Sequence, residues 1–171
     1  MRIASLILCL LAFCTAGHAA VPPEPHGLDK LAAYAGSWKT ESKHVKTTFS
    51  QAGEDTAVLK NDCWRSGDFY ACHQIVNGQS GALVVFQYDA KTGRYITHAI
   101  PANGGGASDG VLTIRDNVWT FPWSRVINGK TIYFHVINVF SGHDHIEYRE
   151  EYSTDGKHWV LMAKGRDTRL R

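Results

Sequence analysis

Two charged side chains lie in segments that are otherwise apolar, and these are the first candidates for chemistry. Glu150 alternates with Tyr148 and Tyr152, while Arg125 follows an aromatic run that ends at Trp123. A charge inside a protein is costly unless it meets a partner or a polar ligand, or lies at a rim in water. We expect Glu150 and Arg125 to meet inside an aromatic cavity, where they would bind the polar part of a small molecule.

Histidines offer two further kinds of chemistry. His98 and His135 lie in aliphatic or aromatic strands, where each is either a general base or a satisfied core histidine. The spacing His143-x-His145-x-Glu147 resembles a metal-binding strand, because alternate residues point to one face. We expect no metal site, since the neighbouring hairpin puts Glu147 on the solvent face and Gly142 and Asp144 place the histidines in a turn.

Motifs for other catalytic classes are missing from the sequence. There is no Gly-x-Ser-x-Gly nucleophile motif, and the glycine-rich run at residues 103–107 is not followed by Gly-Lys-Ser/Thr. The chain has 18 basic and 16 acidic side chains with alternating signs, which argues against a nucleic-acid partner. Its 5 Trp, 7 Tyr and 7 Phe favour an aromatic core or an aromatic-lined pocket.

The N-terminus resembles a secretory signal peptide, which we assign to residues 1–19. A positive start at Arg2 precedes an apolar run, and Gly17 and Ala19 suit a cleavage site. No later segment is long and apolar enough to span a membrane as a helix. The mature protein is therefore expected in the periplasm or secreted, with a proline-rich tether at residues 20–27 and one domain at residues 28–171.

The domain itself is predicted to be all-β. Residues 28–34 have helical spacing and precede Gly36, so they predict one short helix. From Trp38 onward the period changes to two, and turn signals recur every 8 to 14 residues. This pattern predicts about ten strands in an antiparallel up-and-down barrel.

A two-residue turn at Gly67-Asp68 would place two cysteines opposite each other. The register puts Cys63 across from Cys72 at a spacing that a disulfide can bridge. Cleavage of the leader removes the other two cysteines, and exported thiols tend to pair. We predict a structural Cys63–Cys72 disulfide.

Two further turns register the C-terminal half of the chain. A two-residue turn at Asn128-Gly129 pairs Trp123 with Phe134, without deciding which face points inward. A turn at Asp155-Gly156 would put one apolar face inward and the charged face outward. The expected pairs on the inner face are Tyr152 with Trp159, Glu150 with Leu161, and Tyr148 with Ala163.

The chain resembles the lipocalin-like, or calycin, barrels. Gly36-Ser37-Trp38 at the start of the first strand is similar to their Gly-x-Trp entry, and residues 88–95 and 152–159 resemble turns of an uncharacterised bacterial family with that barrel. The resemblance implies a barrel with a ligand cavity. Related haem-binding barrels carry Gly-x-Trp-x-Gly-x-Gly, whereas Lys39, Thr40 and Glu41 follow Trp38 here, so neither haem nor another cofactor is expected.

The function expected from these features is binding of a small apolar or aromatic molecule without catalysis. The expected ligand-binding residues are Trp38, Arg125, Tyr148, Glu150, Tyr152 and Trp159. One alternative is an isomerase, cyclase or hydrolase that uses interior His, Glu and Arg. The other is a cell-envelope interaction module with a filled barrel. The oligomeric state is left open.

Overall fold

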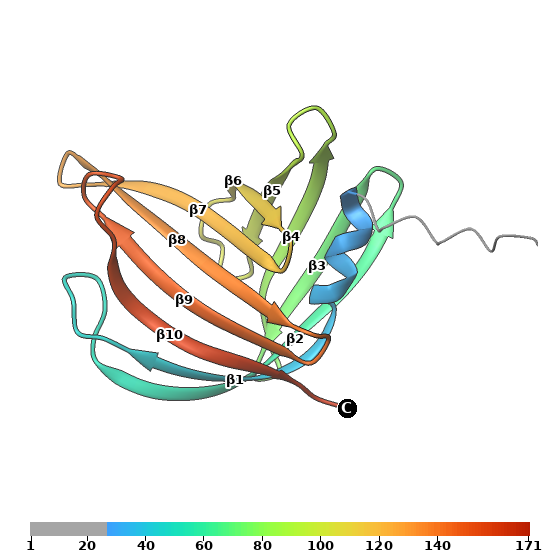
Figure 1. Cartoon of the computed structure of the whole chain (residues 1–171), viewed down its shortest axis with the longest axis horizontal. Coiled ribbons are helices and arrows are strands. Elements are labelled where there is room, and N and C mark those ends of the chain that lie inside the picture. The colour runs from blue at the N-terminus through green and yellow to red at the C-terminus, as the bar shows by residue number, and fades with distance from the viewer. Residues whose placement is uncertain (1–26) are drawn as a thin grey trace, which may run out of the picture.

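The computed structural model describes residues 27–171, which form a closed barrel of ten antiparallel strands and one short helix (Figure 1). Each strand pairs with its neighbours in sequence, and the first pairs with the last, so the predicted up-and-down barrel is confirmed. The signal peptide and the tether up to residue 26 lie outside the described residues. The elements are η1 (Gly27–Tyr34, a 3-10 helix), β1 (Gly36–His44), β2 (Gly53–Ser66), β3 (Phe69–Val76), β4 (Gln79–Asp89), β5 (Arg94–Pro101), β6 (Ser108–Arg115), β7 (Val118–Ile127), β8 (Lys130–Ser141), β9 (His145–Ser153) and β10 (Val160–Arg169).

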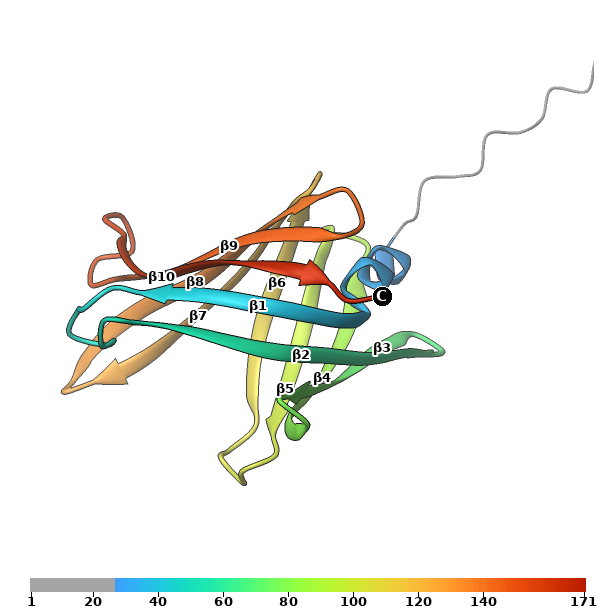
Figure 2. The same cartoon turned by 90° about the horizontal axis from the view of Figure 1, so that it is seen from below.

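One end of the barrel is filled by an apolar cluster that includes the helix. Leu28 and Leu31 of η1 pack with inward-facing side chains such as Trp38, Tyr95 and Leu112, all of them buried. The C-terminus lies beside η1 at this end (Figures 1 and 2). A smaller cluster of Ile132, Phe134 and Met162 forms elsewhere on β8 and β10.

The hairpin of β2 and β3 has the predicted register and the predicted disulfide. Cys63 pairs with Cys72, their Cα atoms are 4.0 Å apart, and the two sulfurs are bonded. Gly67 has a φ of 57°, which suits a tight two-residue turn. Closing a loop of this length stabilises the fold by about 2.5 kcal/mol on the chain-entropy model.

The hairpin of β7 and β8 also has the predicted register, and its inner face is now defined. Trp123 pairs with Phe134 across the turn, where Asn128 and Gly129 both have positive φ. Trp119 is buried in the main cluster, and residues at even spacing from it share the inner face. Phe121 and Trp123 therefore point into the barrel.

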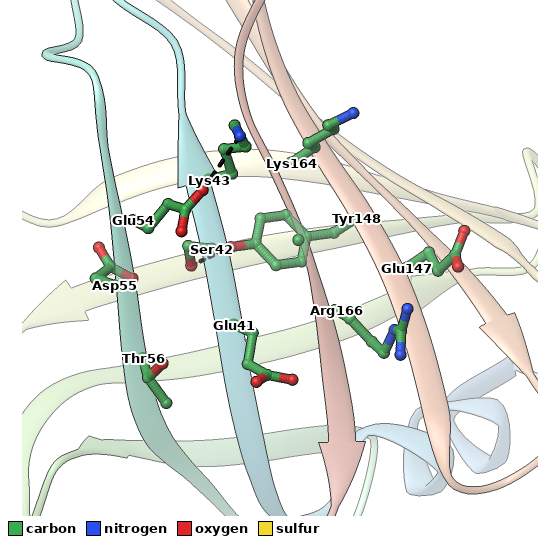
Figure 3. Close-up of a pocket in the computed structure, with 11 residues that line it drawn as sticks. Glu41, Ser42, Lys43, Glu54, Asp55, Thr56, Glu147, Tyr148, Lys164 and Arg166 are labelled. Atoms are coloured by element: carbon green, nitrogen blue, oxygen red, sulfur yellow. Dashed lines mark hydrogen bonds and ion pairs between the residues drawn. The ribbon is translucent and has the colours of Figure 1, made fainter.

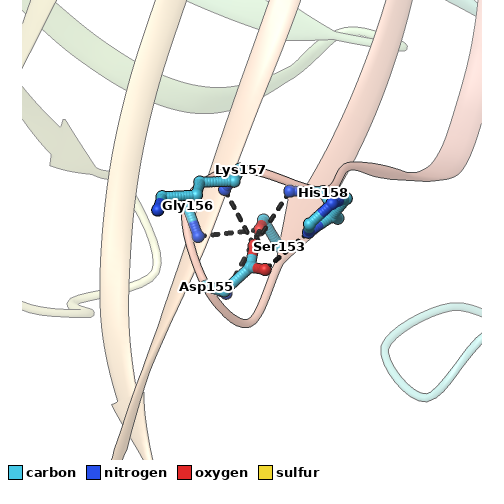
Figure 4. Close-up of polar contacts among 5 residues, drawn as sticks. All are labelled: Ser153, Asp155, Gly156, Lys157 and His158. Atoms are coloured by element: carbon cyan, nitrogen blue, oxygen red, sulfur yellow. Dashed lines mark hydrogen bonds and ion pairs between the residues drawn. The ribbon is translucent and has the colours of Figure 1, made fainter.

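The predicted register of β9 and β10 is wrong, because the connection is not a two-residue turn. The Asp155 carboxylate accepts hydrogen bonds from the backbone N–H groups of Lys157 and His158, and the Ser153 hydroxyl accepts one from Gly156 (Figure 4). These bonds form a longer loop that ends only at Trp159. A bulge after Leu161 adds a second shift, so the observed pairs are Tyr152 with Val160, Glu150 with Ala163, and Tyr148 with Gly165.

The faces of β9 are nevertheless those predicted. Its pairing with β8 places Glu150 beside Val136 and Tyr148 beside the buried Asn138. Glu147 and Arg149 are exposed on the opposite face. The alternation along a strand depends only on the pleat, so an error in the pairing with β10 leaves it unchanged.

Candidate ligand-binding site

The barrel wall has an opening between β6 and β7. These strands pair only from Thr113 to Arg115, opposite residues 118–120, while both continue beyond this point. Figure 2 shows β7 and β8 running away from β5 and β6. Pairing ends two residues before Pro122, which has no backbone N–H to donate and is typical of a strand edge. The local sequence therefore favours an edge at this position.

A hollow of about 700 Å³ occupies this opening. Its lining includes inward-facing residues from both sides of the gap: Thr97 and Ala99 of β5, Gly110 of β6, and Phe121, Trp123 and Arg125 of β7. Outward-facing residues such as Pro122 and Tyr133 line it as well, so it joins the outer surface to the inner face.

The aromatic part of this hollow is fixed by packing. The ring of Trp123 stacks on that of Phe134 with centroids 5.5 Å apart and an interplanar angle of 10°. Phe134 in turn lies edge-on to Phe49, from the loop between β1 and β2. Trp123 and Phe121 remain half-buried, so each ring keeps surface that an apolar ligand can cover.

The inner face of β9, β10 and β1 is polar. Tyr148 on β9 extends across Gly165 on β10 and its hydroxyl hydrogen-bonds to Ser42 on β1. One step along the strands, Glu150 and His44 lie on either side of the small residue Ala163. His44 Nε2 is 2.9 Å from the Asp55 carboxylate, near the rim of the barrel.

Burial changes the proton affinities of this polar face. Desolvation raises the pKa of the half-buried Glu150 carboxyl, and the nearby His44 offsets part of that effect. Burial likewise raises the pKa of the Tyr148 hydroxyl, with the Ser42 hydrogen bond acting in the opposite direction. Carboxyl groups with raised pKa that face a cavity are typical of functional sites, although structural groups show such shifts too.

Asp167 lies deeper on the same face. Its side chain is only 7% exposed, and its Oδ1 has no hydrogen-bond partner among residues 27–171. Burial raises the pKa of this carboxyl, and the neighbouring Thr40 offsets part of the effect. Ionised Asp167 therefore carries a desolvation cost that the rest of the described chain does not recover.

Replacing Asp167 with asparagine should stabilise the fold at neutral pH. We expect the free energy of unfolding at pH 7 to rise by about 1 to 2 kcal/mol, because the variant has no charge to desolvate. The gain should shrink as the pH falls through the raised pKa of the native carboxyl, which is then protonated and also uncharged. Urea titrations at several pH values measure both effects.

Asp62→Asn is the matched control, because Asp62 lies on the outer face with a side chain that is 61% exposed. We expect it to change stability by less than about 0.5 kcal/mol at any of these pH values. A gain for Asp167→Asn that is the same at acidic and neutral pH would contradict the explanation by ionisation.

The structure separates the six residues expected to bind a ligand. Arg125 lines the hollow, while Tyr148, Glu150 and Tyr152 share the inner face of β9. Trp38 is buried in the main cluster and carries the Arg169 guanidinium over its ring at 4.1 Å, so it is a core residue.

Trp159 was expected to point into the barrel, and this expectation is wrong. It stacks on the ring of His135 with centroids 3.7 Å apart, and His135 faces outward, paired with Glu151 at 2.6 Å. The longer loop after Ser153 turns Trp159 back over the outer surface. His98 also faces outward, 2.6 Å from Asp109, so neither histidine reaches the interior as a base.

The expected pairing of Glu150 with Arg125 is also wrong. Across the sheet, Glu150 is in line with Val136 and then Phe121, while Arg125 lies four positions beyond Phe121 on β7. The side chain across Ala163 from Glu150 is instead His44. Sequence reasoning could have found this neighbour only if the pairing of β1 with β10 had been known. Thr97, Ala99 and Gly110 carry no sequence signal for this site.

Two other hollows lie away from this opening, and inward-facing residues such as Tyr148 and Trp119 form part of their linings. One of about 740 Å³ spreads over β2, β1, β10 and β9 among charged side chains such as Lys43, Glu54 and Lys164 (Figure 3). Opposite charges already pair there, as in Lys43 with Glu54 at 3.1 Å. The other, of about 710 Å³, lies beside η1 and is lined by Ala33, Trp119 and Phe140. The first offers a small molecule little apolar contact.

No group of three or more His, Cys, Asp or Glu side chains within residues 27–171 is placed to hold a metal ion. No helix in this range has the length and apolarity to cross a membrane.

The similarities to known proteins concern the fold and not the function. No family model and no curated protein matches the chain. Among solved structures, the chain is similar to Rv2717c from M. tuberculosis, with a TM-score of 0.52, 14% sequence identity, and coverage of 84% of this chain and 97% of that one. A protein of unknown function from the DUF3598 family of Nostoc punctiforme aligns with a TM-score of 0.22, 8% identity, and coverage of 82% of this chain and 97% of that one. The similarity to Rv2717c supports the overall fold alone.

Proposed function

We propose that this protein binds a small, largely apolar or aromatic molecule inside its barrel, without converting it. The observation that carries the proposal is the hollow of about 700 Å³ between β6 and β7, where Phe121 and Trp123 present half-buried rings. Ligand pockets commonly have volumes of roughly 300 to 1,000 Å³, with mostly apolar walls and a few polar groups. The volume of the hollow lies in that range, and its lining combines apolar residues such as Phe121 and Trp123 with polar ones such as Thr97 and Arg125.

The proposal includes kinship with the lipocalin-like barrels and export from the cytoplasm. Gly36-Ser37-Trp38 opens β1, and the meander topology is the one that this resemblance implies. The Cys63–Cys72 bond suits an oxidising compartment. We place the mature protein in the periplasm or outside the cell.

Export predicts a defined N-terminus. Expression of the full chain in a bacterial host, followed by N-terminal sequencing of the periplasmic fraction, should give a protein that begins near Ala20. An uncleaved chain confined to the cytoplasm would contradict the assignment. Replacing Leu8 with arginine, which interrupts the apolar run, is expected to keep the protein in the cytoplasm.

Trp123 should be needed for binding, whereas Trp159 should not. With naphthalen-1-ylmethanol as the probe, we expect Trp123→Ala to weaken binding by about 1 to 3 kcal/mol, because a large aromatic contact is lost. Trp159→Ala is the matched control, since its ring covers His135 on the outer surface. Isothermal titration calorimetry measures both. Equal losses in the two variants, or none in either, would count against this site.

A second candidate function is catalysis, which the arrangement of Asp55, His44 and Glu150 favours. A carboxylate holds one nitrogen of His44, and a half-buried carboxyl with a raised pKa lies on its other side. Such groups can transfer protons to and from a bound molecule. Turnover of a bound compound that is lost in His44→Gln would move the protein to the enzyme class. The third candidate, an interaction module with a filled barrel, would bind no small molecule in the interior.

A further inference from the structure

We infer that the ligand carries a basic nitrogen, protonated at neutral pH, and that the Glu150 carboxylate receives it. The inference rests on the proposed function and adds the chemical class of the ligand. It depends on the position of Glu150 relative to the hollow, on the partners it lacks, and on the sign of the charges facing the interior.

Glu150 is within reach of a ligand in the hollow. The strand register aligns Phe121, Val136 and Glu150 across the inner faces of β7, β8 and β9. Phe121 lines the hollow, and Glu150 lies two strands further on, about 10 Å away at the usual spacing between strands. A bicyclic aromatic group against Phe121 with a short polar arm over Val136 spans that distance.

The carboxylate of Glu150 lacks a partner. Within residues 27–171 it makes no hydrogen bond and no ion pair, although the side chain is half-buried. His44, whose electrostatic effect lowers the pKa of the Glu150 carboxyl, is already hydrogen-bonded to Asp55. Burial of an unpaired carboxylate is unfavourable, and a ligand cation would recover the cost.

The polar inner face is acidic as a whole. Asp55, at the rim, and Glu150 and Asp167 point inward from β2, β9 and β10, with His44 beside them. Arg169 also points inward, at the η1 end, where its guanidinium is already hydrogen-bonded to the carbonyl oxygens of Ala33, Ala35 and His143. Asp167 is more than nine-tenths buried, and its Oδ1 has no partner among the described residues. Arg94 and Arg125, which also line the hollow, are both exposed, so water and salt weaken their fields. The interior therefore favours a cation over an anion.

Three probes of nearly equal shape test the inference: 1-naphthylmethylamine, naphthalen-1-ylmethanol and 1-naphthoate. By calorimetry at pH 7 we expect the amine to bind at least 10-fold more tightly than the alcohol, and the naphthoate to bind most weakly. Glu150→Gln keeps the shape of the side chain and removes its charge, so it should abolish the preference for the amine. Glu147→Gln, on the outer face of the same strand, should retain the preference.

Each other outcome has a definite meaning. Equal binding of amine and alcohol to the native protein, or a preference that survives Glu150→Gln, would overturn the role of Glu150 while leaving the proposed function intact. Tightest binding of naphthoate, lost in Arg125→Gln, would show that the hollow recognises an anion and would also overturn the inference. Failure of all three probes to bind would overturn the proposed function itself. A thermal unfolding curve for Glu150→Gln like that of the native protein establishes that the variant is folded.

Discussion

Replacing Arg169 with alanine should lower the free energy of unfolding by about 4 kcal/mol, which is a large loss for a side chain that is partly exposed. Its guanidinium donates hydrogen bonds to the carbonyl oxygens of Ala33, Ala35 and His143, at 2.9, 2.6 and 2.7 Å, and covers the ring of Trp38. Hydrogen bonds to charged groups each contribute roughly 1.5 to 3 kcal/mol, and the variant leaves three carbonyls without this donor. Chemical denaturation measures the loss.

Arg171→Ala is the matched control for this experiment. Arg171 is 90% exposed and makes one weak contact, 3.4 Å from Asp144. We expect a change of less than about 0.5 kcal/mol. Arg169→Lys should recover less than half of the loss, because a single ammonium group cannot reach three carbonyls in the directions that the planar guanidinium serves. A lysine variant as stable as the native protein would contradict this account.

Replacing Gly165 with alanine should destabilise the barrel by about 3 kcal/mol. A methyl group at this position would meet the backbone carbonyl of Glu41 and would lie 2.7 Å from the ring and hydroxyl of Tyr148. Overpacking of this kind costs roughly 1 to 3 kcal/mol, and loss of the hydrogen bond between Tyr148 and Ser42 adds about 1 kcal/mol. Thermal and urea unfolding test the prediction.

Gly53→Ala provides the comparison, because a methyl group on Gly53 would meet nothing within 4 Å. Gly53 is also in a strand, so the change in intrinsic propensity is the same in both variants. We expect Gly53→Ala to be neutral or slightly stabilising. Similar destabilisation by the two substitutions would mean that propensity, and not the position of Tyr148, accounts for the effect.

The parts of the fold that could be predicted from the sequence are those fixed locally. The turns at Gly67-Asp68 and Asn128-Gly129 need positive φ, which selects short hairpins and sets their registers, so the Cys63–Cys72 pairing followed. Asp155-Gly156 has the same appearance, yet the side chains of Ser153 and Asp155 bind backbone N–H groups and lengthen the loop. Side chains that hydrogen-bond to nearby backbone groups can replace a two-residue turn by a longer loop. A rule based on the Asp-Gly dipeptide alone does not take these side chains into account.

The candidate site was less predictable, because it depends on strands that are distant in the sequence. The inward face of β9 followed from its pleat, which placed Tyr148 and Glu150 correctly. The pairing of β1 with β10 brings His44 near Glu150 and Arg169 over Trp38, and no local pattern encodes that closure. No prediction was based on Pro122, and only the position of β6 shows that the strand edge there opens into the interior.

The central claim, that ligands enter the barrel between β6 and β7, is tested most directly by backbone amide chemical shifts during a titration with naphthalen-1-ylmethanol. We expect saturable shifts at Ala99, Gly110 and Phe121, which line the opening from both sides. Amides beside η1, such as those of Ala33 and Asn117, should not move. Saturable shifts confined to the groove beside η1, with none at the opening, would contradict the claim.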